Sequence, residues 1–321
     1  MTPAATLEAA CEGVPQIMMS RAGVARRGHD VRNGPIPSGP LGKVYRELML
    51  GDDLPATPEV ALAIMAIVDK EDADVADLAA LVPRDPALAT RLLAVSNGLY
   101  FGAARRITDI RQAVTMLGFA RVREIVTTLS VGQMLRLDDA NPEVLHTWRH
   151  SLLVAGAAKL LARGVGLRSE EAFIAGVLHD IGKLVFGLRF HDVYWGLVAR
   201  AKETGQPLDV LEQATWGCHH GTVGCWLLQS WGLSGTFIEP ATRHHDPLVV
   251  ERDPKLWAIV NVANRLVGAT NDEGELVPEV REECRPFLPK TFTPARWMRA
   301  YANLLADNDA LLMLCDQELG D

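Results

Sequence analysis

Apolar residues recur every three or four positions along most of this chain, and short polar breaks separate the recurrences. Such spacing is typical of helices that turn one face towards a core. Between residues 54 and 137 it predicts five helices, with apolar faces that include Val60, Leu78, Leu88, Ile110 and Val122. No stretch there keeps the period of two that a half-buried strand requires. We therefore predict an all-α fold whose first subdomain is a five-helix unit.

Proline, aspartate and glycine mark the ends of these five helices. Thr57-Pro58-Glu59 and Asp85-Pro86 each place proline at a first helical position beside an acidic residue. Asp74 opens the helix between them. Asn97-Gly98 should end the third helix, and Gly118 suits the left-handed position at the end of the fourth. These end signals agree with the helices that the apolar spacing predicts.

The second half of the chain shows the same helical spacing after a polar break at residues 138–142. Ser169 should cap a helix that delivers the dipeptide His179-Asp180. Further helices are expected at 144–161, 187–204, 220–231, 235–245 and 254–268. Thr293-Pro294 begins a last helical segment, which should pack on the helical body through Trp297, Leu304 and Leu305.

The breaks divide the chain into four successive parts. Residues 1–40 are rich in glycine, proline and arginine, so we expect a flexible, solvated tail, with docking to an acidic partner as the alternative. The other parts are the five-helix subdomain (41–137), a second helical subdomain packed against it (142–270) and a C-terminal helical extension (271–321).

Composition limits the classes of function. The 321 residues are 48% hydrophobic, which suits a packed globular protein, and the net charge of −8 provides no general basic surface for nucleic acid. Five cysteines without a CxxC pair argue against a disulfide framework and fit a reducing compartment. No apolar run has the length of a membrane span or of a signal-peptide core. We therefore expect a cytoplasmic protein that binds neither a membrane nor nucleic acid directly.

Several histidines and one aspartate form the candidate site. His179-Asp180 stands near a helix end, where adjacent side chains converge more easily than within a helix, in which neighbours diverge by about 100°. Imidazole nitrogen with carboxylate oxygen suits the first-row metals iron, manganese, zinc or nickel better than calcium or magnesium. The candidate ligands are His150, His179, Asp180, His220, His244 and His245.

The alternative for each histidine is an ordinary core or surface residue, and His29, His146 and His191 fit that alternative. In each of the doublets 219–220 and 244–245 we expect one member to face inward. A metal held by the candidate ligands could lower the pKa of a bound water and create a hydroxide nucleophile. Phosphoester hydrolysis is the natural reaction for such a site, especially if Asp180 bridges two metals.

The candidate site lies within a longer resemblance to a known family. From Leu54 to about Gly268 the chain resembles HDOD domains, a non-standard branch of the HD metal-dependent phosphohydrolase superfamily. The resemblance rests on Leu54–Glu59, Arg84–Leu88, Ser96-Asn97, Ile107–Arg111, Leu117-Gly118, Trp148–Ser151, Gly176–Leu184, His220–Gly224, Trp231 and His244-His245. It implies a helical output module of bacterial-type signalling, in a family most of whose members have no demonstrated catalysis.

The resemblance also assigns roles by position. It implies metal-site roles for His150, His179, Asp180, His220 and one of His244 or His245. The closing aspartate of the superfamily should fall within Val260–Asn264, where this chain has Asn264, whose amide is neutral and a poor ligand. Relatives that cleave cyclic dinucleotides carry Gly-Tyr-Pro soon after the paired histidines, and this chain lacks that motif.

Two functions compete. The first is a regulatory module that binds signalling proteins and has a vestigial or ligand-sensing metal pocket, to which a nucleotide-like ligand could bind; Asn264 and the missing Gly-Tyr-Pro favour it. The second is a metal-dependent phosphohydrolase acting on a nucleotide or phosphoester, which the retained histidines and the potentially catalytic Asp180 favour. Because no receiver, kinase or diguanylate cyclase domain fits in the remaining residues, we expect input from another chain or a small ligand.

Overall fold

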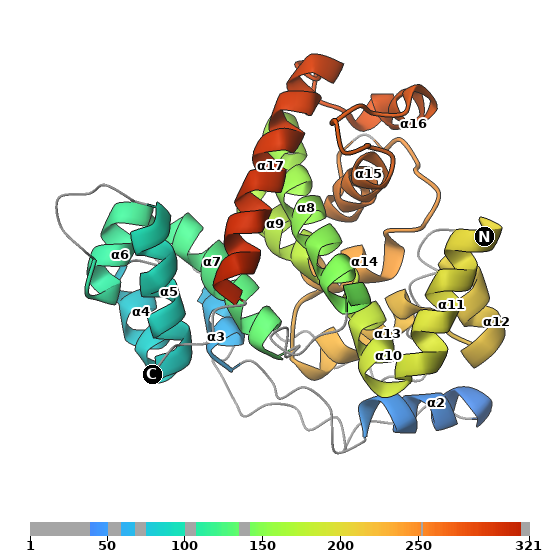
Figure 1. Cartoon of the computed structure of the whole chain (residues 1–321), viewed down its shortest axis with the longest axis horizontal. Coiled ribbons are helices and arrows are strands. Elements are labelled where there is room, and N and C mark those ends of the chain that lie inside the picture. Colours follow the sequence, from blue (N-terminus) through green and yellow to red (C-terminus); the bar gives the residue numbers. More distant parts are fainter. Residues whose placement is uncertain are drawn as a thin grey trace. The chain divides into compact units, whose positions relative to one another are not determined.

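The computed structural model describes residues 39–50, 59–67, 75–99, 107–134, 142–251 and 253–315. Within these ranges the chain is all-helical, and the β structure there is limited to an isolated antiparallel bridge between Thr270 and Leu276 (Figure 1). The all-α prediction is therefore confirmed. None of the helices described is long and apolar enough to cross a bilayer. Cys218, Cys225 and Cys284 are buried thiols.

Contacts along the chain divide it into two units, each assembled from separate stretches of sequence. Unit 1 takes Met1–Pro55 and Leu178–Asn261, and unit 2 takes Ala56–Val177 and Val262–Asp321. The boundaries predicted from sequence, by contrast, divide the chain into successive parts, and they stay a prediction. Of the predicted flexible tail, residues 1–38 lie outside the described part of the chain.

Unit 2 contains the helices of the first half of the chain and the C-terminal helices. They are α3 (Glu59–Ile67), α4 (Val75–Leu81), α5 (Pro86–Leu99), α6 (Ile110–Leu117), α7 (Phe119–Met134), α8 (Pro142–Val165), α9 (Ser169–Leu178, except its last residue), α16 (Pro278–Cys284) and α17 (Pro294–Cys315), with short 3-10 turns at Val82–Arg84 and Arg285–Phe287. Helix α15 (Leu256–Gly268) is divided between the units after Asn261.

The five helices predicted for the first half correspond to α3 to α7. Asp85 caps α5 by accepting a hydrogen bond from the Leu88 backbone N–H at 3.0 Å, and Gly118 ends α6 with a positive φ of 82°. Helix α5 continues to Leu99, slightly past the end predicted at Asn97-Gly98. The predicted start signals Thr57-Pro58 and Asp74 lie outside the described residues.

Helix α17 packs along α8 within unit 2. A Cβ atom on Gly156 would lie only 2.3 Å from Leu304 Cδ2, so the two helices approach closely at this glycine. The Asn308 amide donates to the Arg149 carbonyl at 3.0 Å, and Arg149 pairs with Asp309 at 2.6 Å. Trp297 is buried, as the sequence predicts for this segment.

Unit 1 includes three helices that the sequence analysis did not predict, namely α2 (Gly39–Met49), α10 (Ile181–Arg189) and α12 (Leu208–Trp216). Its other helices are α11 (His191–Thr204), α13 (His220–Ser230) and α14 (Gly235–Arg243). The helix end predicted beside His179-Asp180 is confirmed, since α9 ends at Leu178, but the start of the next helix at residue 187 is wrong, because α10 starts directly after Asp180. Burial of Ile181, Leu184 and Val185 outweighs the low helix propensity of glycine here.

Gly182 is the point at which α10 passes α13. A Cβ atom at this position would lie 1.9 Å from the His220 carbonyl oxygen and 2.8 Å from the Gly224 backbone nitrogen. Both neighbours are backbone atoms, which cannot move aside as a side chain could. The missing side chain therefore allows Asp180, at the start of α10, to lie next to His220, at the start of α13.

We predict that Gly182→Ala destabilises the metal-free protein by about 1–3 kcal/mol, because the added methyl group overpacks two helix backbones. Chemical denaturation in the presence of a chelator measures this change. The matched control is Gly196→Ala on α11, where a Cβ atom meets nothing within 4 Å and the free energy of unfolding should stay equal or rise. Equal stability of the two variants would contradict the close approach of α10 and α13.

Candidate metal centre

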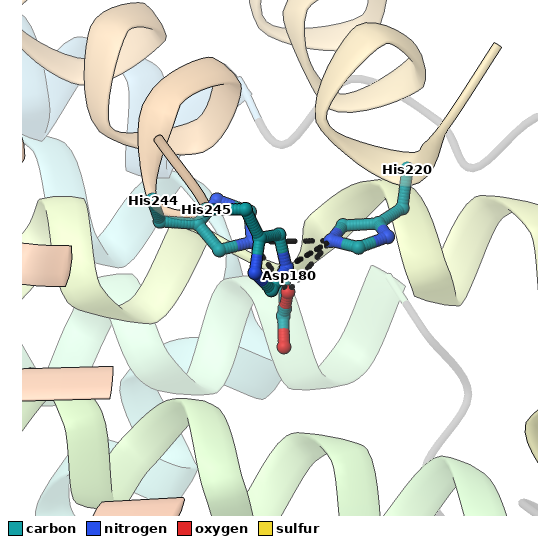
Figure 2. A group of neighbouring side chains, drawn as sticks. All are labelled: Asp180, His220, His244 and His245. Atoms are coloured by element: carbon teal, nitrogen blue, oxygen red, sulfur yellow. Dashed lines mark hydrogen bonds and ion pairs between the residues drawn. The ribbon is translucent and has the colours of Figure 1, made fainter. Parts of the chain in front are cut away.

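Asp180, His220, His244 and His245 come together in unit 1 (Figure 2). Each lies at or just beyond a helix end: Asp180 precedes α10, His220 begins α13, and His244 and His245 follow α14. One ligand atom from each residue lies within 4.8 Å of the others. Asp180, His220 and His244 are buried, whereas His245 is exposed, so the cluster meets solvent at His245.

The ligand atoms face one another at short distances. His220 Nε2 lies 3.1 Å from His244 Nε2 and 3.0 Å from His245 Nε2. Asp180 Oδ1 lies 3.2 Å from His244 Nε2 and 3.5 Å from His220 Nε2. The expectation that one histidine of each doublet faces inward is correct for His220 and wrong for the second doublet, because both His244 and His245 direct Nε2 into the cluster.

His179 lies beside the cluster, and its Nε2 is 3.3 Å from Asp180 Oδ2. Its ring packs edge-on against the ring of His244, with centroids 4.9 Å apart. Lys183, one turn further along α10, donates to the same Oδ2 atom at 2.7 Å. Thus Oδ2 interacts with Lys183 and His179, while Oδ1 is turned towards the other histidines.

Interactions around the cluster hold the backbone that carries the histidines. His219 caps α13 by accepting a hydrogen bond from the Gly221 backbone N–H at 3.1 Å. After α14, the Arg243 guanidinium stacks over the Trp257 ring at 3.8 Å and donates to Asp246 at 2.8 Å. The Asn261 amide donates to the Asp246 carbonyl at 2.8 Å, which closes the turn containing His244-His245.

Hydrogen bonds determine the tautomer of His220. Its Nδ1 lies 2.6 Å from Glu212 Oε2, and its backbone N–H donates to the same oxygen at 2.8 Å. Above a pH of about 7, the raised pKa of Glu212, this carboxylate is ionised and only accepts hydrogen bonds, so Nδ1 carries the ring hydrogen. In the neutral imidazole, Nε2 is then an unprotonated acceptor that points at Asp180 and His244.

Hydrogen bonds also determine the tautomer of His244. Its Nδ1 lies 2.9 Å from the Ala241 carbonyl and 3.2 Å from the Pro240 carbonyl, and carbonyl oxygens accept hydrogen bonds. Its Nε2 is therefore also unprotonated in the neutral ring. Two nitrogen lone pairs and one carboxylate oxygen thus face one another in a buried space, which is an unfavourable arrangement unless a cation joins them.

Burial sets the charge of this cluster. Desolvation lowers the pKa of His220, His244 and His245, so these rings are neutral at pH 7. Desolvation alone would raise the pKa of Asp180, but the neighbouring His179 and Lys183 outweigh it and hold the pKa well below its usual range. The cluster therefore presents neutral imidazoles and a carboxylate, which is the protonation state that metal binding requires.

The spacing of the donor atoms also fits a metal. Two atoms bound about 2.1 Å from one metal lie about 3.0 Å apart at a right angle and about 3.4 Å apart at the tetrahedral angle. The four distances given above between donor atoms of the cluster, from 3.0 to 3.5 Å, are close to this range. Three imidazoles with one carboxylate suit a first-row transition metal rather than calcium or magnesium.

His150 and Asn264 belong to unit 2. His150 is half-buried on α8, and its Nε2 lies 2.8 Å from Asn264 Oδ1. An amide oxygen only accepts, so this hydrogen bond requires a hydrogen on His150 Nε2. A role for His150 in the same metal site remains a prediction. Of the other histidines, His146 and His191 are exposed, and His29 lies outside the described residues.

Glu212 and Lys183 are functional candidates that the sequence analysis missed. Glu212 lies in α12, a helix that was not predicted, and a single glutamate in an unassigned segment looks like a surface residue. Its position eight residues before His220, next to the apolar Leu208 and Leu211, was the available signal. Burial raises the pKa of Glu212 to about 7. The hydrogen bonds that it accepts from His220 and Tyr194 lower the pKa, but burial outweighs them.

We predict that the metal-free protein loses stability as the pH falls below about 6.5, the usual pKa of histidine. Below that pH the unfolded chain binds protons that the buried His220 and His244 do not bind, because their folded pKa values are lowered. His244→Asn should therefore reduce the loss by up to about 1.4 kcal/mol per pH unit. Urea unfolding at several pH values measures this.

The control for the pH series is His191→Asn, because the His191 side chain is exposed in the folded state. It should leave the slope of stability against pH unchanged. A His244→Asn variant with the wild-type slope would show that His244 is protonated in the fold, contrary to the hydrogen bonding described above.

Comparison with known proteins identifies the family of this chain. The sequence profile of the HDOD domain matches residues 54–247. An uncharacterised protein of Treponema pallidum (strain Nichols) is 28% identical over 219 residues, which are 67% of this chain and 42% of that protein. The chain therefore spans less than half the length of this curated relative.

Solved structures share the fold. An HDOD domain protein of unknown function from Geobacter sulfurreducens is 26% identical, with a TM-score of 0.65 over 84% of this chain and 97% of the other. A Marinobacter aquaeolei VT8 protein named for signal transduction is 19% identical, with a TM-score of 0.65 over 98% and 66%. The latter likeness shows the fold alone. Because the HDOD profile matches more than half of the chain, this protein belongs to the HDOD domain family.

Proposed function

We propose that this protein is a regulatory module of bacterial-type signal transduction that binds one divalent first-row metal in unit 1 and acts through protein partners. The observation that supports metal binding is the pair of unprotonated Nε2 atoms of His220 and His244, which face Asp180 Oδ1 at 3.5 and 3.2 Å. Asp180, His220, His244 and His245 would hold the metal. The regulatory role is consistent with the family and with the name of the Marinobacter protein of the same fold.

The state of His150 and Asn264 argues against an efficient two-metal hydrolase. Asn264 is neutral, and its Oδ1 accepts a hydrogen bond from His150 Nε2. A second metal would need this imidazole nitrogen without its hydrogen, and it would lack the charge of an aspartate at position 264. The ligands of one cation are thus better preserved than those of a bridged pair.

Phosphoester hydrolysis is the second candidate, and Lys183 favours it. A bound metal would supply Lewis acidity and lower the pKa of a coordinated water. Lys183 lies 2.7 Å from Asp180 Oδ2, so it holds a positive charge beside the site, where a phosphate oxygen could be bound. The exposed His245 marks the side from which a ligand could enter.

We predict that the purified protein, loaded with zinc, manganese or iron and freed of excess metal, retains one metal ion per chain by elemental analysis. Asp180→Ala and His220→Ala should lose this ion, because each removes a donor atom of the buried cluster. His146→Ala, which removes an exposed imidazole, is the control and should retain the metal. An unchanged metal content in Asp180→Ala would mean that another site binds the ion.

Phosphodiesterase activity should be weak or absent in the wild type, tested on a chromogenic phosphodiester and on cyclic dinucleotides. Asn264→Asp should raise the metal content, because it restores the negative charge of the superfamily motif. Protein partners should be captured equally by the wild type and by His179→Ala. Robust cleavage of a cyclic dinucleotide that His179→Ala abolishes would overturn the regulatory proposal in favour of the hydrolase.

A further inference from the structure

A buried chain of hydrogen bonds extends from the histidine cluster into the interior of unit 1. The Tyr194 hydroxyl on α11 donates to Glu212 Oε1 on α12 at 2.8 Å. The other carboxylate oxygen, Oε2, receives the His220 backbone N–H at 2.8 Å and lies 2.6 Å from His220 Nδ1. All three residues have no exposed surface. Both oxygens of Glu212 are therefore engaged, one by Tyr194 and one by His220.

The geometry constrains the His220 ring in two ways. Oε2 binds the ring and the backbone of the same residue, so it restricts rotation of the imidazole about its side-chain bonds. It also keeps the ring hydrogen on Nδ1, which leaves Nε2 as the atom that faces Asp180, His244 and His245. In known metal sites, a carboxylate on the second nitrogen of a histidine ligand fixes its tautomer and raises its basicity.

A purely structural role would not require a carboxylate here. Glu212 does cap the first turn of α13 through the His220 N–H, and a negative charge at a helix N-terminus is favourable. However, burying a carboxylate carries a large desolvation penalty, and the oxygen of a neutral glutamine could accept the two hydrogen bonds from His220. What the carboxylate adds is negative charge against His220 Nδ1, on the ring side opposite the proposed metal.

We propose that Glu212 is a positioning residue for His220, which holds its ring in the Nδ1–H form for metal binding, and that Tyr194 in turn holds Glu212. This inference rests on the proposed metal-binding function. In this pair of a carboxylate and a histidine, Glu212 is not a metal ligand but orients the ligand His220. Within the donor cluster Glu212 hydrogen-bonds to His220, so its effect should reach the metal through this ring.

The first test measures zinc affinity at pH 8 by competition with a chromophoric chelator. Glu212→Gln, which keeps the shape and the acceptor but removes the charge, should weaken binding by about 10- to 100-fold. Tyr194→Phe should weaken binding less, because it leaves the carboxylate in place. Glu203→Gln is the matched control, since it removes the same charge from an exposed position on α11 and should leave affinity unchanged. Wild-type affinity in Glu212→Gln would overturn the proposal.

The second test reads the tautomer directly in metal-free protein by nitrogen-15 NMR of the histidine rings, assigned with His220→Gln. His220 should be in the Nδ1–H form in the wild type and in Glu212→Gln, and should shift towards Nε2–H in Glu212→Leu. A wild-type His220 in the Nε2–H form would overturn the proposal. If the wild type binds no zinc yet has the Nδ1–H form that Glu212→Leu loses, the metal-binding function fails while the positioning of His220 by Glu212 stands.

Discussion

The hydrogen bond between Glu212 and Nδ1 of His220, 2.6 Å long, determines the chemistry of the histidine cluster, because it decides which ring nitrogen faces inward. The carbonyls at the end of α14 do the same for His244. With both hydrogens directed away from the centre, two lone pairs meet the carboxylate of Asp180. The surrounding burial keeps the His220 and His244 rings neutral, so neither ring balances the charge of Asp180. A buried cation would turn this unfavourable arrangement into a stable one.

The packing of α10, α13 and α14 brings three helix ends to one point. Gly182 permits contact between the backbones of α10 and α13, which sets Asp180 beside His220. The stack of Arg243 on Trp257 fixes the turn after α14 that carries the two remaining histidines. Side chains at helix ends can converge where side chains within one helix diverge, so a wholly helical unit can build a compact donor set.

The sequence predicted the helical class and drew attention to the clustered histidines, because periodic apolar spacing and a distinctive family motif are both local signals. It did not predict α10, since Gly182 looks like a helix end until its packing against α13 is known. Nor did it reveal Glu212, whose burial depends on α11, α12 and α13 together. It also allowed only one of His244 and His245 to face inward, because it could not describe the turn that directs both rings.

Asn264 distinguishes this chain from the pattern of the wider superfamily, and its hydrogen bond to His150 is consistent with a protein in which one metal site is kept and a second is lost.

The main proposal is that a metal binds to Asp180, His220, His244 and His245. Anomalous diffraction at the absorption edge of the bound metal, from crystals of the loaded protein, tests it directly. The account predicts one peak bonded to Asp180 and to Nε2 of His220, His244 and His245. A peak bonded to His150, or none near Asp180, would contradict it.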